Sequence, residues 1–376
     1  MDLESKLILS FNPCFRHFIQ YLLDKSSDLS FMNDPLKIVD ACSGSQSLTM
    51  TESADRLKLK IPYAQQVLTW EVIFDVNNWK EPPDFIFDDA DDFYPPLDKI
   101  NSFILWDWKN QESLAAVVAE LLELYKEHHL ERAGTNINLQ RHFRSLLAES
   151  PRDLQVIVNK NEKGLSTVNV LVKLEVTFES LPPYLQQGKP GPHSAVLHAY
   201  LSNPDASYIK TQLFLSPAVE NAFGGPTSLH IPAFQQGVLL GEYLVLIKQL
   251  LVNQILLVTK YYEKRKDFIL AFVNHFGKSV LEYDVEAFNK IVLLFEWNDF
   301  FFTFTVELPF HFPDDRPTFF FKSIYHNQNK KPYTEKHTHF PYSPRWSGNE
   351  MAKRTSDFIL SHIKAFQMAS VNNSDR

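Results

Sequence analysis

Cysteine and glycine are scarce in this sequence. Cys14 and Cys42 are the only two cysteines in 376 residues. Two cysteines exclude a disulfide framework and are typical of a chain kept in a reducing compartment. The 11 glycines stand against 31 phenylalanines, many of which lie in strand-like runs. We therefore expect large aromatic cores.

Positive charge is also in short supply, because the formal net charge is −8. A face for DNA or RNA needs clustered Lys and Arg, so we expect no nucleic-acid partner. The start of the chain carries Asp2 and Glu4 and lacks a basic-then-apolar signal pattern. The most apolar stretch, 238–258, contains Glu242 and Lys248, as well as polar Gln and Asn residues. A bilayer core would accept these poorly, so the stretch predicts a buried helix and no membrane span.

The length and the hydrophobic fraction of 44 % predict two or three domains with sizeable cores. We place an N-terminal domain at 1–135, a central domain at 136–241, a C-terminal domain at 242–370 and a flexible tail at 371–376. A long helix at the start of the C-terminal domain is expected to be shared with the central domain.

The N-terminal third shows a helix, four strands and a second helix. Asn12 can cap the first helix and Pro13 fits its first position. The expected strands are Lys37–Cys42, Arg56–Ile61, Val67–Phe74 and a short one after Pro82-Pro83. A helix then follows with apolar residues at helical spacing from Leu114 to Tyr125, and Gly134 ends it.

The C-terminal third repeats this plan. A long helix is predicted at Tyr243–Phe276, followed by strands at Val280–Tyr283, Ile291–Trp297 and Phe300–Leu308, with Asn298-Asp299 as a hairpin turn. Pro317-Thr318-Phe319 starts another strand, 234 positions after Pro83-Asp84-Phe85. The last helix has a capping box, Ser347 with Glu350. Its expected apolar face holds Met351, Thr355, Phe358, Ile359, Ile363 and Phe366. A repeat this long indicates duplicated domains.

The central region is less regular. A short helix with Phe143, Leu146 and Leu147 precedes apolar runs at Leu154–Val158, Val168–Phe178, Ala195–Leu201 and Ile209–Leu215. These runs predict either a third, decayed copy of the same plan or an unrelated linker sheet. We favour the first interpretation.

The repeated plan resembles the ubiquitin-conjugating fold. The stretch 321–326, Phe-Lys-Ser-Ile-Tyr-His, resembles the strand that leads to the Tyr-His-Pro-Asn motif of that family. Asn327 and Gln328 follow His326, so the Pro and Asn of the motif are missing. The nucleophilic cysteine of active relatives would fall near Lys336, and no cysteine follows Cys42. The resemblance therefore implies an α+β protein of tandem inactive UEV/RWD-like domains, each a four-stranded antiparallel meander flanked by helices, without catalytic residues.

Longer stretches resemble the scaffold subunits of the BRISC deubiquitinase assembly and its relatives. They are 60–64, 82–87, 229–234, 341–346 and 348–354. The resemblance implies a bridge between a JAMM-type deubiquitinase, with its pseudo-enzyme MPN partner, and a small von-Willebrand-A-like adaptor. Such complexes cleave ubiquitin chains linked through lysine sixty-three of ubiquitin. The implied setting is cytoplasmic and nuclear, in DNA-damage signalling and repair, the cell cycle, chromatin regulation and apoptosis.

Two other functions were weighed against the scaffold. A stand-alone inactive reader of ubiquitin or peptides would need only one such domain, whereas this chain shows two or three. An atypical active ubiquitin-transfer enzyme would need a nucleophile that the downstream sequence lacks. Whether ubiquitin is bound, and which residues contact partners, the sequence leaves open.

Several motifs have both a functional and a plain interpretation. His326, His337 and His339 could suggest a metal, but no further ligand stands at a suitable spacing, so we expect no metal and no cofactor. The acidic loop Asp88–Asp92 could receive a basic partner patch or a cation; a solvated loop is favoured. We expect Lys264-Arg265-Lys266 to be a solvated face.

Three aromatic segments could belong to binding surfaces. The strand Phe300–Phe304 has aromatics on both of its faces, so it is either buried on both sides or covered outside by another subunit. Tyr94-Pro95-Pro96 and Tyr342–Trp346 could shape a peptide groove. For these two Pro-containing segments, however, we favour the roles of ending loops and anchoring the core.

Overall fold

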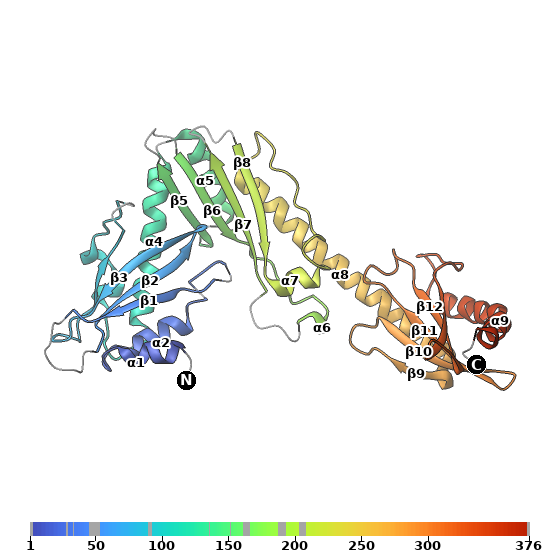
Figure 1. The fold of residues 1–376 in the computed structure, drawn as a ribbon. Helices are drawn as coiled ribbons and strands as arrows, with labels where there is room; N and C mark the ends of the chain where they lie inside the picture. Colours follow the sequence, from blue (N-terminus) through green and yellow to red (C-terminus); the bar gives the residue numbers. More distant parts are fainter. Residues whose placement is uncertain are drawn as a thin grey trace. The chain divides into compact units, whose positions relative to one another are not determined.

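The computed structural model describes an α+β protein. The described residues are 3–27, 29–32, 34–44, 53–88, 92–134, 136–150, 152–160, 166–186, 193–202 and 208–373. They form antiparallel sheets of four, four and five strands flanked by helices (Figure 1), which confirms the expected class. The chain divides into two compact units. The first unit comprises Met1–Val176, Ser194–Ser216 and Ile231–Gln249, and the second comprises Thr177–His193, Pro217–His230 and Leu250–Arg376.

The first sheet has the order β1-β2-β3-β4. Its strands are β1 (Lys37–Cys42), β2 (Arg56–Tyr63), β3 (Gln66–Ile73) and β4 (Asp84–Ile86), as the sequence predicted to within two residues. Alternation along β2 turns Leu57, Leu59 and Ile61 into the core. There they share a hydrophobic cluster with Leu121 and Tyr125 of a long helix.

The helices around this sheet are α1 (Leu3–Ser10), α2 (Arg16–Asp24), η2 (Leu97–Lys99), α3 (Asn101–Ile104) and α4 (Ser113–Ala133). The sequence prediction missed α1. The predicted cap of the next helix was wrong as well, because α2 begins only at Arg16. Asn12 instead accepts a hydrogen bond from the Cys14 N–H at 3.1 Å and forms a tight turn of its own. Helix α4 ends before Gly134, as predicted.

The central residues form a second four-stranded meander. After α5 (Ile137–Glu149) come β5 (Leu154–Lys160), β6 (Ser166–Lys173), β7 (Ala195–Ser202) and β8 (Tyr208–Leu215), paired in that order. All four predicted runs are strands, but β6 ends at Lys173 rather than Phe178. The short helices α6 (Pro183–Gln186) and α7 (Pro217–Ala222) belong to the second unit.

Buried polar contacts join the first two sheets within the first unit. The Ala64 N–H, in the turn between β2 and β3, donates to Gln155 Oε1 of β5 at 3.0 Å. The Val158 N–H donates to His129 Nδ1 of α4 at 3.2 Å. Both acceptor side chains are buried, so breaking either bond would leave a backbone donor without a partner. These contacts fix the register of β5 against α4.

His129 makes the stability of this junction dependent on pH. Burial, helped by the nearby His128 and Arg132, lowers the pKa of His129 to about 3. The folded state therefore keeps His129 neutral, whereas the unfolded chain protonates it below about pH 6.5. Between pH 7 and pH 5 the free energy of unfolding of the wild-type chain should therefore fall by about 2 kcal/mol more than that of His129→Gln, which lacks the titrating group. Urea titrations of both proteins at the two pH values measure it, and parallel losses would contradict it.

Helix α8 (Leu240–Phe276) contributes to both units and starts three residues before the predicted helix. Its length and composition alone would suffice for a membrane span. Core helices have the same composition, and one side of α8 is buried along its length through Leu244, Ile247, Leu251 and Ile255. At its start the helix packs closely, because Gly241 lies against the Ser145 carbonyl with no room for a Cβ atom.

The sheet of the second unit has five strands where four were expected. They are β9 (Val280–Tyr283), β10 (Lys290–Trp297), β11 (Phe300–Glu307), β12 (Thr318–Gln328) and β13 (Lys331–His337), in the order β13-β12-β11-β10-β9. Strand β13 was not predicted from the sequence. Asn329 and Lys330 adopt positive φ angles of 52° and 61°, which makes a tight hairpin there. The turn predicted at Asn298-Asp299 is confirmed, because both residues also adopt positive φ angles.

Helix α9 (Gly348–Asn372) covers one face of this sheet; η3 (Gly277–Ser279) precedes β9. Ser347 Oγ accepts from the Glu350 N–H at 3.3 Å, as the predicted cap requires. All six residues of the predicted apolar face are buried. The helix includes residues 371 and 372, which the sequence analysis assigned to the tail, because hydrogen bonding continues to Asn373. Residues 374–376 of the predicted tail lie outside the described residues.

Candidate functional site

The face of the second unit's sheet that points away from α9 is a candidate binding surface. Alternation along β11 sends Phe300, Phe302 and Phe304 into the core, while Phe301 points to the opposite side and stays half-buried. We call this opposite side the outer sheet face. The register places on this face Lys290, Val292, Leu294, Glu296, Phe301, Thr303, Thr305, Glu307, Thr318, Phe320, Lys322, Thr334 and Lys336.

The register places aromatic, aliphatic and cationic side chains in rows across this face. Thr305 pairs with Val292 on one side and Phe320 on the other, and Phe320 pairs with Lys336. The Lys336 Nζ lies 5.9 Å from the centre of the Phe320 ring, within reach of a cation–π contact. Aromatic residues are enriched at the centres of protein interfaces. The aromatic strand is thus buried on its inner side only, and the outer side is open within the second unit.

His326 has a structural position at the end of β12. Its Nδ1 lies 3.0 Å from Ser370 Oγ on α9 and 3.4 Å from Ser323 Oγ, and its ring lies 6.0 Å from that of Phe300. These contacts tie the end of the strand to the end of the helix. The side chain is therefore engaged in holding the fold.

No thiol lies near His326 in the second unit, since Cys14 and Cys42 both belong to the first unit. Cys14 is half-buried in the turn before α2, and Cys42 is exposed at the end of β1. Lys336, where the resemblance places the nucleophile of active relatives, pairs with Phe320 in the β12–β13 ladder. The second unit thus presents an amine and an aromatic ring at that position.

The three histidines predicted as a conceivable metal site do not converge. His337 Nε2 lies 3.5 Å from Glu335 Oε2, His339 contacts Thr338, and His326 contacts Ser370. Within the described residues, no group of three or more His, Cys, Asp or Glu side chains could hold a metal ion. Their geometry therefore gives each histidine a separate local role.

Arg265 is a residue whose role the sequence analysis got wrong. Lys264 is exposed as predicted, but Arg265 is only 2 % exposed. Its guanidinium donates to the carbonyls of Ala287 and Phe310 at 3.1 and 2.7 Å and to the Tyr184 hydroxyl at 3.0 Å. Burial lowers its pKa. A planar guanidinium can serve three separate acceptors at once, so Arg265 joins three segments of the second unit.

The segment Tyr342–Trp346 lines a hollow of about 350 Å³ together with Phe268 and Met351. The Tyr342 hydroxyl also donates to the Pro313 carbonyl, and the Arg354 guanidinium lies 4.0 Å from the Trp346 ring centre. These side chains therefore anchor the loop, which was the favoured role, and they also border a hollow; the peptide groove stays a prediction.

The acidic loop and the first Pro-rich segment lie after β4. Asp88 and Asp92 are exposed, whereas Asp89 and Asp91 lie outside the described residues. Tyr94 is 74 % exposed, which gives it no part in the core.

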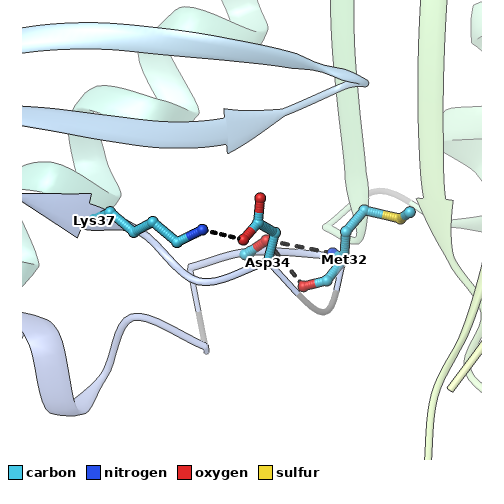
Figure 2. A network of polar contacts seen from close by, with 4 residues as sticks. Met32, Asp34 and Lys37 are labelled. Carbon is cyan, nitrogen blue, oxygen red and sulfur yellow. Dashed lines mark hydrogen bonds and ion pairs between the residues drawn. The ribbon is translucent and has the colours of Figure 1, made fainter. Parts of the chain in front are cut away.

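The loop between α2 and β1 has a fixed local geometry that the sequence analysis did not single out (Figure 2). Ser30 Oγ donates to the Met32 carbonyl at 3.1 Å and accepts from the Met32 N–H, while Lys37 pairs with Asp34. Phe31 and Met32 border a hollow of about 390 Å³ with Val196 and Phe214 of the second sheet. Ser-x-Met alone carries too little signal to predict this contact.

Taken with the sheets, these features define an α+β protein of consecutive antiparallel meanders, each covered by helices, with an open aromatic face in its second unit. The family described as Brain and reproductive organ-expressed protein (BRE) matches residues 10–327, and the chain belongs to this family.

Two relatives match along nearly all of the chain. "BRISC and BRCA1-A complex member 2" of Branchiostoma floridae is 38 % identical over 382 residues, covering 100 % of both chains. The protein of the same name from Danio rerio is 38 % identical over 347 residues, covering 90 % of each. By their names, both relatives are members of protein complexes.

Proposed function

We propose that this chain is a non-catalytic scaffold subunit of a deubiquitinase complex of the BRISC and BRCA1-A type. The observation that carries the proposal is its full-length similarity to two proteins named as members of those complexes. The outer sheet face supports it, because its half-buried aromatic side chains, Phe301 and Phe320, fit a surface that another subunit covers.

The proposed architecture is a series of UEV/RWD-like domains at 1–135, 136–241 and 242–370. Its support is the recurrence of one plan, helix followed by antiparallel meander, in all three sheets. In the first and last copies a strand also starts directly after a proline, at Asp84 and at Thr318. Proline lacks the N–H that a continuing ladder would need, so it suits the start of a strand.

The proposed partners are a JAMM-type deubiquitinase with its pseudo-enzyme MPN partner, and a small von-Willebrand-A-like adaptor. The substrates of the complex would be ubiquitin chains linked through lysine sixty-three. We place the deubiquitinase on the C-terminal domain and the adaptor on the N-terminal domain. We also propose that one form of the complex acts in the cytoplasm and another in the nucleus, where it takes part in DNA-damage signalling.

The outer sheet face can be tested in the full chain. Phe301→Ser combined with Phe320→Ser should reduce co-purifying deubiquitinase at least tenfold and keep the adaptor, because central aromatics dominate interface energies. The matched control is Leu360→Ser with Met368→Ser on the solvent side of α9. Loss of the adaptor alone would reverse the proposed polarity. Retention of both partners would exclude the outer sheet face as their docking surface.

The non-catalytic role leads to a further prediction. Incubation with ubiquitin-activating enzyme, ATP and ubiquitin should yield no adduct that a reducing agent removes, because no cysteine follows Cys42. Gel electrophoresis with and without reductant measures this, with an active conjugating enzyme as the positive control. A reducible adduct that Cys14→Ala or Cys42→Ala abolishes would show that the chain is an enzyme.

A further inference from the structure

A short segment of the first unit exposes four large apolar side chains. Leu97 of η2 and Ile104 at the end of α3 are 38 % and 67 % exposed, and Leu105 is 78 % exposed. Tyr94, three residues before Leu97, is more than two-thirds exposed as well. Single exposed apolar residues are ordinary, but four within twelve positions form a concentrated patch.

Hydrogen bonds to α4 and buried neighbouring side chains hold the patch in position. The Asn101 and Ser102 N–H groups donate to the Glu120 carboxylate of α4 at 3.0 and 2.8 Å. Burial acts to raise the pKa of Glu120, but these hydrogen bonds lower it overall, so the carboxylate is ionised at neutral pH. On the inner side, Ile100 is buried and the Phe103 ring lies 5.9 Å from that of Phe85. Ile104 and Leu105 are therefore presented to solvent by an anchored turn.

The charge around the patch is mostly negative. Residues 84–107 contain seven Asp and one Lys. Asp92 and Asp98 flank the apolar side chains in sequence and are exposed. Within the part of the chain that the structure describes, neither is in an ion pair. The surface thus combines fixed apolar groups with a negative field, which attracts cationic partners and repels anionic ones.

We propose that Tyr94, Leu97, Ile104 and Leu105, with Asp92 and Asp98, form a docking surface for a basic amphipathic segment of another protein. Its apolar side chains would cover the exposed apolar ones, and its flanking Lys or Arg would meet the aspartates. A second copy of this chain is disfavoured because two such surfaces would repel each other, and an anionic membrane is disfavoured for the same reason. The proposal goes beyond the scaffold role, since it holds whichever complex the chain joins.

Fluorescence anisotropy of the full chain tests the proposal. The probe is a labelled 18-residue helical peptide made of Leu on one face and Lys on the other. Two control probes have Glu in place of Lys, or Ser in place of Leu. The Leu/Lys peptide should bind, and both controls should bind at least tenfold more weakly.

Variants then locate the site. Ile104→Ser with Leu105→Ser should weaken binding at least tenfold, and Asp92→Asn with Asp98→Asn at least threefold, with the second effect lost in 0.5 M salt. Asn also tolerates the positive φ of 50° at Asp92. The matched controls are Val245→Ser with Leu246→Ser, an exposed apolar pair on α8, and Glu127→Gln with Glu149→Gln, two exposed carboxylates on α4 and α5.

Three outcomes would overturn the proposal. The Glu peptide could bind as well as the Lys peptide, or the control variants could lose as much binding as the patch variants. Alternatively, sedimentation could show a dimer of the full chain that Ile104→Ser with Leu105→Ser dissolves, which would assign the patch to a second copy. Circular dichroism melting of every variant confirms that binding losses do not reflect unfolding.

Discussion

Phe358→Ala should destabilise the second unit by about 3–5 kcal/mol, the usual cost of emptying a buried phenylalanine site. The ring is 8 % exposed and lies 5.7 Å from that of Phe319 and 5.9 Å from that of Phe340. It is thus the point where α9 meets the start of β12 and the loop after β13. Chemical denaturation followed by near-ultraviolet circular dichroism measures the change.

Leu360→Ala is the control, because Leu360 lies two positions away on the same helix and is 57 % exposed. Its effect should stay within about 0.5 kcal/mol. Equal effects of the two substitutions would show that the inner face of α9 is assigned wrongly.

Arg265→Met should cost about 3 kcal/mol or more. The substitution keeps an unbranched side chain but leaves the carbonyls of Ala287 and Phe310 and the Tyr184 hydroxyl without their donor. A buried polar group without its partner costs about 1–3 kcal/mol. Denaturant unfolding compares this variant with Lys264→Met, which alters an exposed neighbour and should be nearly neutral.

Arg265→Lys sharpens this test. A lysine keeps the positive charge but cannot direct donors at three separated acceptors, so it should recover only part of the loss. Full recovery by lysine would mean that charge alone matters at this position and that the three hydrogen bonds contribute little.

The sequence predicted most strands well because alternation and turn residues are local signals. Strands β1 and β9 begin and end at the predicted residues. Strand β13 escaped prediction because Lys, Thr and Glu dominate it, as is common for edge strands that must not pair with other chains. Its one buried hydrophobic residue, Tyr333, is too weak a pattern to reveal a strand.

Burial of a charged residue is harder to predict than a strand. Arg265 stands between Lys264 and Lys266, and the triplet suggests a solvated face. Helical spacing could have indicated that Arg265 is buried. Tyr261 lies four positions before it and Phe268 three positions after it, so all three share one helix face, and both aromatic residues are buried. The acceptors that make this burial tolerable come from distant segments, which no local pattern can reveal.

Exposure of apolar groups is likewise a tertiary property. The outer sheet face could be suspected from the aromatic run, but only the position of α9 decides which of its sides is open. The sequence analysis singled out neither Ile104 nor Leu105, whose exposure to solvent is seen only in the folded chain. The two candidate binding surfaces therefore needed the structure.

The central claim is that this chain is a subunit of a deubiquitinase complex. Affinity purification of the tagged full chain from cells that express it, followed by quantitative mass spectrometry, tests the claim most directly. The account predicts a JAMM-type deubiquitinase and a von-Willebrand-A-like adaptor in amounts comparable to the chain itself. Recovery of the intact chain with neither protein above the level of an untagged control would contradict it.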